Sequence, residues 1–270
     1  MATAAAGARI AGPEGASLSA EPATGALLAI IHRDELLIAI HKPSGLLVHR
    51  TLLDRRETLF AMQLLRDQIG RHVYPVHRLD RGTSGVLLFA LDRQAARVVG
   101  AQFEAQQVGK RYLAVVRGHP PEAGSIDHPL TRQRDDDDFR PQQCEAGEPQ
   151  AALTRYRRLA TAELPHAVDR YASSRYALLE LQPETGRRHQ LRRHLKHIAH
   201  PIIGDATHGK GRHNRLFAEL FDSHRLLLAC VELSLAHPVS GKPLLLKAPP
   251  AEDFARVARA LDWDHALRDG

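Results

Sequence analysis

The chain has 270 residues, of which 43% are apolar and 25% charged, a composition ordinary for a globular protein with a sizeable core. Two cysteines are too few for a disulfide framework or a cysteine zinc site, no apolar run could span a bilayer, and no secretory signal opens the chain, so we expect a cytoplasmic protein without a membrane partner. The formal net charge of +6 is compatible with a polyanionic partner.

The apolar pattern predicts short strands and helices from residue 27 onward. Residues 1–24 are rich in Ala, Gly, Ser and Pro, lack periodicity, and are expected to form a disordered tail. Strands are predicted at 27–40 (a hairpin), 86–90, 112–116, 176–181 and 226–235, and helices at 59–69, 94–107, 189–200 and from 251 onward. Residues 132–150, which contain four consecutive Asp, read as a flexible acidic insertion. The rest, residues 25–270, is expected to be one α+β domain.

One carboxylate, Asp80, lies in the segment HRLDRGTSG (77–85), directly before an apolar strand. The flanking Arg78 and Arg81 favour the ionised form of this acid. An ionised carboxylate held by a tight turn beside a rigid strand is suited to act as a nucleophile. An isolated Arg-Leu-Asp-Arg is more often a surface ion pair, so the rest of the chain has to decide between the two interpretations.

Positive charge is concentrated between residues 181 and 215. This window holds eight Lys or Arg against only Glu184 and Asp205, an excess equal to the net charge of the whole chain, and six histidines lie in it as well. Such a concentration suits a phosphate backbone, and the alternative is a solvated helix face.

Four segments together closely resemble the RluA-type pseudouridine synthases in their order and spacing. These segments are KPSGLLVH (42–49), HRLDRGTSG (77–85), KRYLA (110–114) and ETGRRHQLR (184–192), the last followed by HPIIGD (200–205). The resemblance covers roughly residues 27–250. It implies the α+β catalytic fold of that family, with a mixed, largely antiparallel sheet flanked by helices and a central RNA-binding cleft.

The resemblance also implies a reaction and its catalytic residues. The bond from uracil N1 to ribose C1′ breaks, the base turns, and C5 is joined to C1′; no atoms enter or leave, so we expect no cofactor and no metal. Asp80 matches the catalytic aspartate, which acts at C1′ or on the C2′ proton. Arg187 matches the basic residue that pairs with this aspartate, and Tyr112 matches a tyrosine that stacks on the uracil and whose hydroxyl acts as a base or orients one. The glycines after Asp80 are expected to let the backbone approach the ribose.

Further residues are expected to contact the substrate. Arg78 matches an arginine that fills the space left by an extruded base, and Leu191 is a candidate for the apolar wall. On local grounds alone, Tyr112 on a strand and Leu191 on a helix are as typical of ordinary packing. The remaining candidates for substrate contact are His77, Arg192, Arg193 and Lys196.

Within the family, the chain most resembles a member described as acting on uridine 65 in the T-stem of certain tRNAs. No S4-like RNA-binding module is expected before the domain, as in that member. We therefore expect a monomer whose partner is tRNA and not DNA, with ribosomal RNA as the alternative substrate.

Two other classes of protein remain to be weighed. His194, His197 and His200 have a spacing that a metal hydrolase could use, but no acidic residue accompanies them in the predicted helix. A non-catalytic RNA-binding module would account for the basic window. It would not account for Asp80, because a carboxylate in the groove repels a polyanion.

Overall fold

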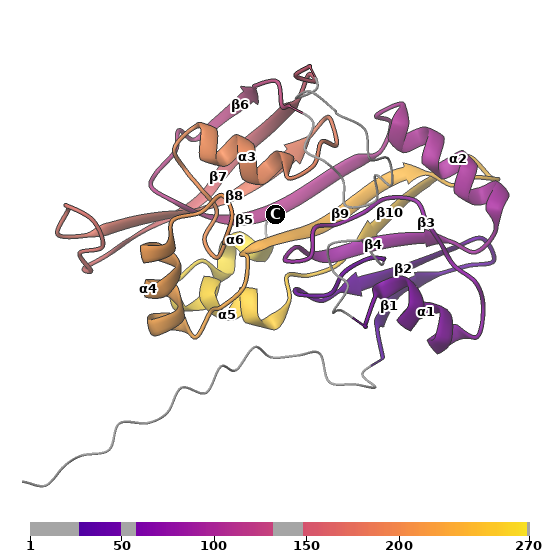
Figure 1. Cartoon of the computed structure of the whole chain (residues 1–270), viewed down its shortest axis with the longest axis horizontal. Helices are drawn as coiled ribbons and strands as arrows, with labels where there is room; N and C mark the ends of the chain where they lie inside the picture. The colour runs from indigo at the N-terminus through magenta and orange to yellow at the C-terminus, as the bar shows by residue number, and fades with distance from the viewer. Residues whose placement is uncertain (1–26, 50–57, 132–147, 269–270) are drawn as a thin grey trace, which may run out of the picture.

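The computed structural model of the chain describes residues 27–49, 58–131 and 148–268. The predicted tail 1–24, and residues 132–147 of the predicted acidic insertion, lie outside the described residues. The described part contains one ten-stranded sheet with helices packed on it (Figure 1). The strands are β1 (Ala29–Arg33), β2 (Leu37–Lys42), β3 (Tyr74–Pro75), β4 (Ser84–Ala90), β5 (Gly109–Arg117), β6 (Ala123–Asp127), β7 (Leu153–Leu164), β8 (Ser174–Pro183), β9 (Leu228–Ala236) and β10 (Pro243–Lys247). The helices are α1 (Ala61–Ile69), α2 (Arg93–Glu104), α3 (Gln190–His197), α4 (Gly211–Phe221), α5 (Glu252–Ala260) and α6 (Asp264–Arg268).

The sheet is mixed but largely antiparallel, as predicted. Its strand order is β1-β2-β4-β9-β5-β8-β7-β6, with β10 paired to β9 and β3 paired to β4. The single parallel pairing among these strands joins β4 to β9, where Ser84 and Gly85 lie beside Ala229 and Cys230. This pairing unites the N-terminal strands with the central strands, so the loop before β4 comes close to β5 and β9.

The two faces of the central strands are covered by different helices, because successive side chains on a strand point to opposite sides. Leu113 of β5 packs with Phe217 of α4 and Phe254 of α5. Its neighbour Ala114 packs with Leu195 of α3 on the other face. Helix α3 therefore covers one face of β5 and β8, while α4, α5 and α6 cover the opposite face (Figure 1).

A separate core lies around the N-terminal strands. Leu65 of α1 and Val99 of α2 belong to one buried cluster with Leu87 of β4 and Ile38 of β2. Every residue of β4 is buried, which accounts for the continuous apolar run in its sequence. No helix in the described part of the chain is long and apolar enough to cross a membrane.

Most of the predicted elements are confirmed, with ends shifted by a few residues. The predicted hairpin corresponds to β1 and β2, and the other predictions correspond to β4, β5, β8, β9, α1, α2, α3 and α5. Strands β3, β6, β7 and β10 and helix α4 were not predicted, and the single helix predicted from residue 251 onward is divided into α5 and α6. Strand β7 was missed because its sequence, LTRYRRLATAEL, carries several charges and most of its side chains are only half-buried or exposed.

Candidate active site

A cavity of about 430 Å³ lies where distant segments of the chain meet; we call it the pocket. It is lined by the loop before β4, the end of α2, the start of β5, the continuous segment from the end of β8 into the first turn of α3, and the start of β9. Seven of the nine residues chosen from sequence line it: His77, Arg78, Asp80, Tyr112, Arg187, Leu191 and Arg192. Arg193 and Lys196 are not among its lining residues.

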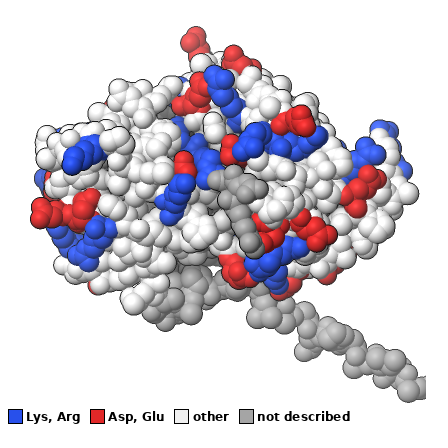
Figure 2. Space-filling model, turned by 180° about the vertical axis from the view of Figure 1, so that it is seen from behind, with Lys and Arg blue, Asp and Glu red and all other residues white. Residues whose placement is uncertain are grey.

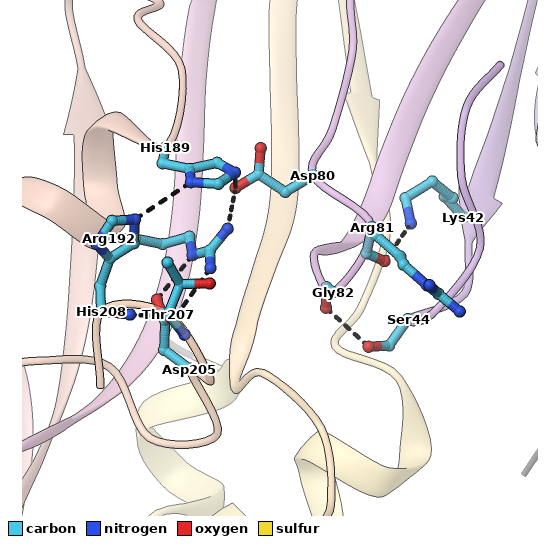
Figure 3. A network of polar contacts seen from close by, with 10 residues as sticks. All are labelled: Lys42, Ser44, Asp80, Arg81, Gly82, His189, Arg192, Asp205, Thr207 and His208. Atoms are coloured by element: carbon cyan, nitrogen blue, oxygen red, sulfur yellow. Dashed lines mark hydrogen bonds and ion pairs between the residues drawn. The ribbon is translucent and has the colours of Figure 1, made fainter. Parts of the chain in front are cut away.

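The loop that carries Asp80 is fastened to the turn after β2. Lys42 is fully buried, and its ammonium donates to the carbonyl oxygens of Pro43, Leu46 and Arg81, at 2.7–3.1 Å. Figure 3 shows the contact with Arg81. The hydroxyl of Ser44 donates to the carbonyl of Gly82 at 2.7 Å. Burial lowers the pKa of Lys42 to about 7. The segment KPSGLLVH therefore has a structural role, because it holds the backbone directly after Asp80.

The glycines after Asp80 lie in a tightly packed part of the loop. Gly85 has a φ of +109°, and a Cβ built on it would lie 1.9 Å from the carbonyl oxygen of Cys230. A Cβ on Gly82 would lie 3.0 Å from the Cβ of Leu226. This loop therefore packs closely against β9 and the residues that precede it, which by itself requires glycine at 85.

The cation that pairs with Asp80 is Arg192, so the prediction that Arg187 forms this pair is wrong. Nη1 of Arg192 lies 3.1 Å from Oδ2 of Asp80, and the other edge of the guanidinium binds Asp205 (Figure 3). Arg187 lies in the loop before α3, where its Nε donates to the carbonyl of Ala151 at 3.1 Å. Only 10% of the Arg192 side chain is exposed, which also disfavours the predicted contact with a phosphate.

His189 lies beside Asp80 as well, although it was not among the residues predicted for the site. It caps α3 in the left-handed conformation, with a φ of 52°. Its Nε2 lies 3.9 Å from Oδ2 of Asp80, and its Nδ1 lies 3.2 Å from Nε2 of His208. Burial lowers the pKa of His189 to about 4, so the imidazole is neutral at physiological pH. The sequence offered two signals for it, its place among the six histidines of the basic window and its place in the segment ETGRRHQLR (184–192).

Tyr112 lies on β5, between Leu181 of β8 and Cys230 of β9, and its ring lines the pocket together with Asp80. The hydroxyl is paired with the thiol of Cys230. Burial, with smaller contributions from Cys230 and Asp80, raises the pKa of Tyr112 well above its usual value. The phenol therefore stays protonated, which argues against the hydroxyl acting as a phenolate base. The aromatic ring remains the part of Tyr112 that could contact a substrate.

His77 and Leu191 form part of the walls of the pocket. The Nε2 of His77 accepts a hydrogen bond from the backbone N–H of Leu88 at 2.9 Å, and its ring stacks on Phe103. Burial lowers the pKa of His77 to about 3, so this ring is neutral as well. Leu191 is 7% exposed, so it packs in the core under α3 and also lines the pocket.

The outer face of α3 carries the remaining candidates. Arg193 donates to the carbonyl and the hydroxyl of Thr131, and Lys196 is exposed. His194 is buried, with its ring nitrogens facing the Thr154 hydroxyl and the His128 carbonyl. Across residues 27–49, 58–131 and 148–268, no three His, Cys, Asp or Glu are placed to hold a metal ion.

Comparison with known proteins identifies relatives along most of the chain. A family profile described as RNA pseudouridylate synthase matches residues 36–197. The tRNA pseudouridine synthase C of Vibrio cholerae is 49% identical over 243 residues, covering 89% of this chain and 98% of that protein. The protein of the same name from Pectobacterium carotovorum is 55% identical over 244 residues, covering 89% of this chain and 64% of its own length. The solved structure of human RNA Pseudouridylate Synthase Domain Containing 1 is 28% identical, with a TM-score of 0.64 over 85% of this chain and 86% of that one.

Proposed function

Since the chain belongs to the RNA pseudouridylate synthase family, of the RluA type, we propose that it converts a uridine of tRNA to pseudouridine, and that the target is uridine 65 in the T-stem. The enzyme is an isomerase. The choice of tRNA is supported by relatives named tRNA pseudouridine synthase C that are 46–55% identical and align with 88–90% of this chain. The observation that carries the chemistry is the pocket in which Asp80 meets Arg192 and Tyr112.

We propose that Asp80 is the reacting group. Arg192 places a positive charge 3.1 Å from its carboxylate, and that carboxylate is the group that would attack C1′ or remove the C2′ proton. In either route the proton on C5 leaves and a proton reaches N1, so the reaction balances without any further reactant. The ring of Tyr112 offers a face on which the detached uracil can stack while it turns.

The surroundings of the pocket suit a bound RNA. Arg187 and Arg188 line it from the loop before α3, and Arg78 lines it from the loop before β4. We propose that Arg187 contacts the RNA backbone, and that Arg193 and Lys196 extend this contact along α3. On the face opposite to that of Figure 1, Lys and Arg are interspersed with Asp and Glu, so that face presents no unbroken basic surface (Figure 2).

The substrate is tested by mapping pseudouridine in total RNA from cells with and without the gene. We expect the loss of pseudouridine at a single T-stem position of certain tRNAs, and its return when the wild-type gene is supplied. The gene with Asp80→Asn serves as a control that produces the protein without its reacting carboxylate. Loss confined to ribosomal RNA would reject tRNA as the substrate and would keep the enzyme class.

Substitutions of Tyr112 separate its ring from its hydroxyl. We expect Tyr112→Leu to lower the rate of pseudouridine formation about 10- to 100-fold, because stacking of a base on an aromatic ring contributes roughly 1–3 kcal/mol. Tyr112→Phe keeps the ring and loses only the pairing with Cys230, so its rate should fall less than about 10-fold. Single-turnover rates with tRNA, together with melting temperatures, measure both. Equal losses in the two variants would show that the reaction depends on the hydroxyl and not on the ring.

A further inference from the structure

Asp205 is a buried carboxylate that lies behind Arg192 and does not line the pocket. Its side chain has 0% exposure and accepts hydrogen bonds from Nε and Nη2 of Arg192 at 2.7 and 2.8 Å. The backbone N–H groups of Thr207 and His208 donate to the same carboxylate at 2.9 and 2.8 Å (Figure 3). Burial opposes its ionisation, but these hydrogen bonds outweigh burial and keep the pKa of Asp205 below its usual value.

Because of the shape of the guanidinium, the contact with Asp205 fixes the orientation of the Arg192 side chain. The group is planar, and its N–H donors form a rigid fork. Asp205 occupies the edge made by Nε and Nη2 in a bidentate pairing, which fixes the plane of the group. Nη1 then has one direction, and it lies 3.1 Å from Oδ2 of Asp80. Asp80 consequently receives a hydrogen bond from Nη1 alone and does not compete for the bidentate edge.

Asp205 is in turn fixed from α4. Asn214 accepts the N–H of Gly204 through Oδ1 at 2.8 Å and donates from Nδ2 to the carbonyl of Asp205 at 3.1 Å. Gly204 has a φ of +79°, and a Cβ there would lie 1.7 Å from the carbonyl oxygen of Arg225. Contacts that do not involve Arg192 therefore fix the backbone at Gly204 and Asp205.

We propose that Asp205 is a positioning residue of the isomerisation, which orients Arg192 so that one N–H of its guanidinium meets the reacting carboxylate of Asp80. This inference rests on the proposed role of Asp80. It adds a second carboxylate, from the loop between α3 and α4, that acts on the reaction only through Arg192.

The variant Asp205→Asn tests the proposal in the full-length enzyme. An amide has only one acceptor oxygen, so it cannot hold both N–H groups of the fork, and Arg192 is released from its fixed plane. We expect the single-turnover rate with tRNA to fall about 100-fold, since a displacement of about 1 Å can cost on the order of 10²-fold. The KM for tRNA should change less than about 2-fold, because Asp205 lies outside the pocket.

Asp34→Asn is the matched control. Asp34 also accepts two backbone N–H groups and pairs with a basic side chain, His32, but it lies in the β1–β2 turn, away from the pocket. We expect its rate to equal that of the wild type. If Asp34→Asn loses as much rate as Asp205→Asn, the effect is one of general stability, and the proposal is wrong.

A double-mutant cycle tests whether Asp205 acts through Arg192. In an Arg192→Met background, Asp205→Asn should cause no further loss of rate, because the group that it orients is gone. The same 100-fold loss in both backgrounds, or a wild-type rate in Asp205→Asn alone, overturns the proposal. If Asp205→Asn does not fold, Asn214→Ala replaces it, with the same expected fall in rate at constant KM and the same conclusion from an unchanged rate.

Failure of this proposal is distinguishable from failure of the proposed function. All rates are compared with the wild-type enzyme on the RNA that it modifies. If the wild type modifies ribosomal RNA and not tRNA, the substrate assignment fails, while the comparison of Asp205→Asn with the wild type still decides the role of Asp205.

Discussion

Asp80→Asn is expected to abolish pseudouridine formation, with a fall in single-turnover rate on the order of 10⁴-fold or more, as for loss of a covalent nucleophile. The amide is neutral, and it can neither attack C1′ nor accept the C2′ proton. The fold should survive, because Arg192 keeps its bidentate partner Asp205 and no buried charge is left uncompensated. The single-turnover rate checks the loss of activity, and the melting temperature checks the fold. The dissociation constant for tRNA shows whether the variant still binds its substrate.

The control for this variant is Asp92→Asn. Asp92 caps α2 by accepting the N–H groups of Gln94 and Ala95, and asparagine caps a helix as well as aspartate does. Its rate should be that of the wild type. A rate within about 10-fold of the wild type in Asp80→Asn would remove Asp80 from the chemistry and return it to the surface ion pair that its local sequence also allowed.

Replacing Arg192 with Met is expected to lower the rate on the order of 10³-fold and to destabilise the protein. Asp205 then becomes a buried carboxylate without its cation, a change that typically costs 3–5 kcal/mol. The stability of the variant should also respond differently to pH. In the wild type the pKa of Asp205 lies below its usual value, so its contribution to stability is present above about pH 4 and is lost as the pH falls. Without Arg192 this loss should be smaller, because the carboxylate gains from protonation.

Arg187→Met is the informative comparison, since Arg187 is the residue that the sequence selected for this role. Its Nε is engaged by the carbonyl of Ala151, so we expect the variant to raise the KM for tRNA and to lower the maximal rate less than about 10-fold. Denaturant unfolding at several pH values and single-turnover kinetics separate the two arginines. If Arg187→Met is the inactive variant and Arg192→Met the active one, the pairing seen in the structure is not the one used in catalysis.

Local sequence predicted much of the fold because it reports burial. The continuous apolar run of β4 and the helical spacing in α2 follow directly from which face of each element is covered. Strands β6 and β7 escaped prediction for the same reason, since they lie at the margin of the sheet and expose many side chains. Strand β10 pairs with β9 outside the main path of the sheet, and its five residues, PLLLK, show no polar–apolar alternation that would mark a strand.

The sequence by itself determined the family, and it determined that Asp80, Tyr112 and the segment 184–192 belong to one site, because these segments keep a fixed order and spacing. It could not determine which arginine of that segment meets Asp80. Arg187 and Arg192 are five residues apart, and the direction of each guanidinium depends on where α3 begins and on what occupies its other edge. Only the tertiary structure decides this: α3 begins at Gln190, and Asp205 returns beneath it to take one edge of Arg192. Asp205 comes from a separate loop, so the local sequence around Arg187 or Arg192 does not indicate that it binds one of them. Its choice of Arg192 is seen only in the folded chain.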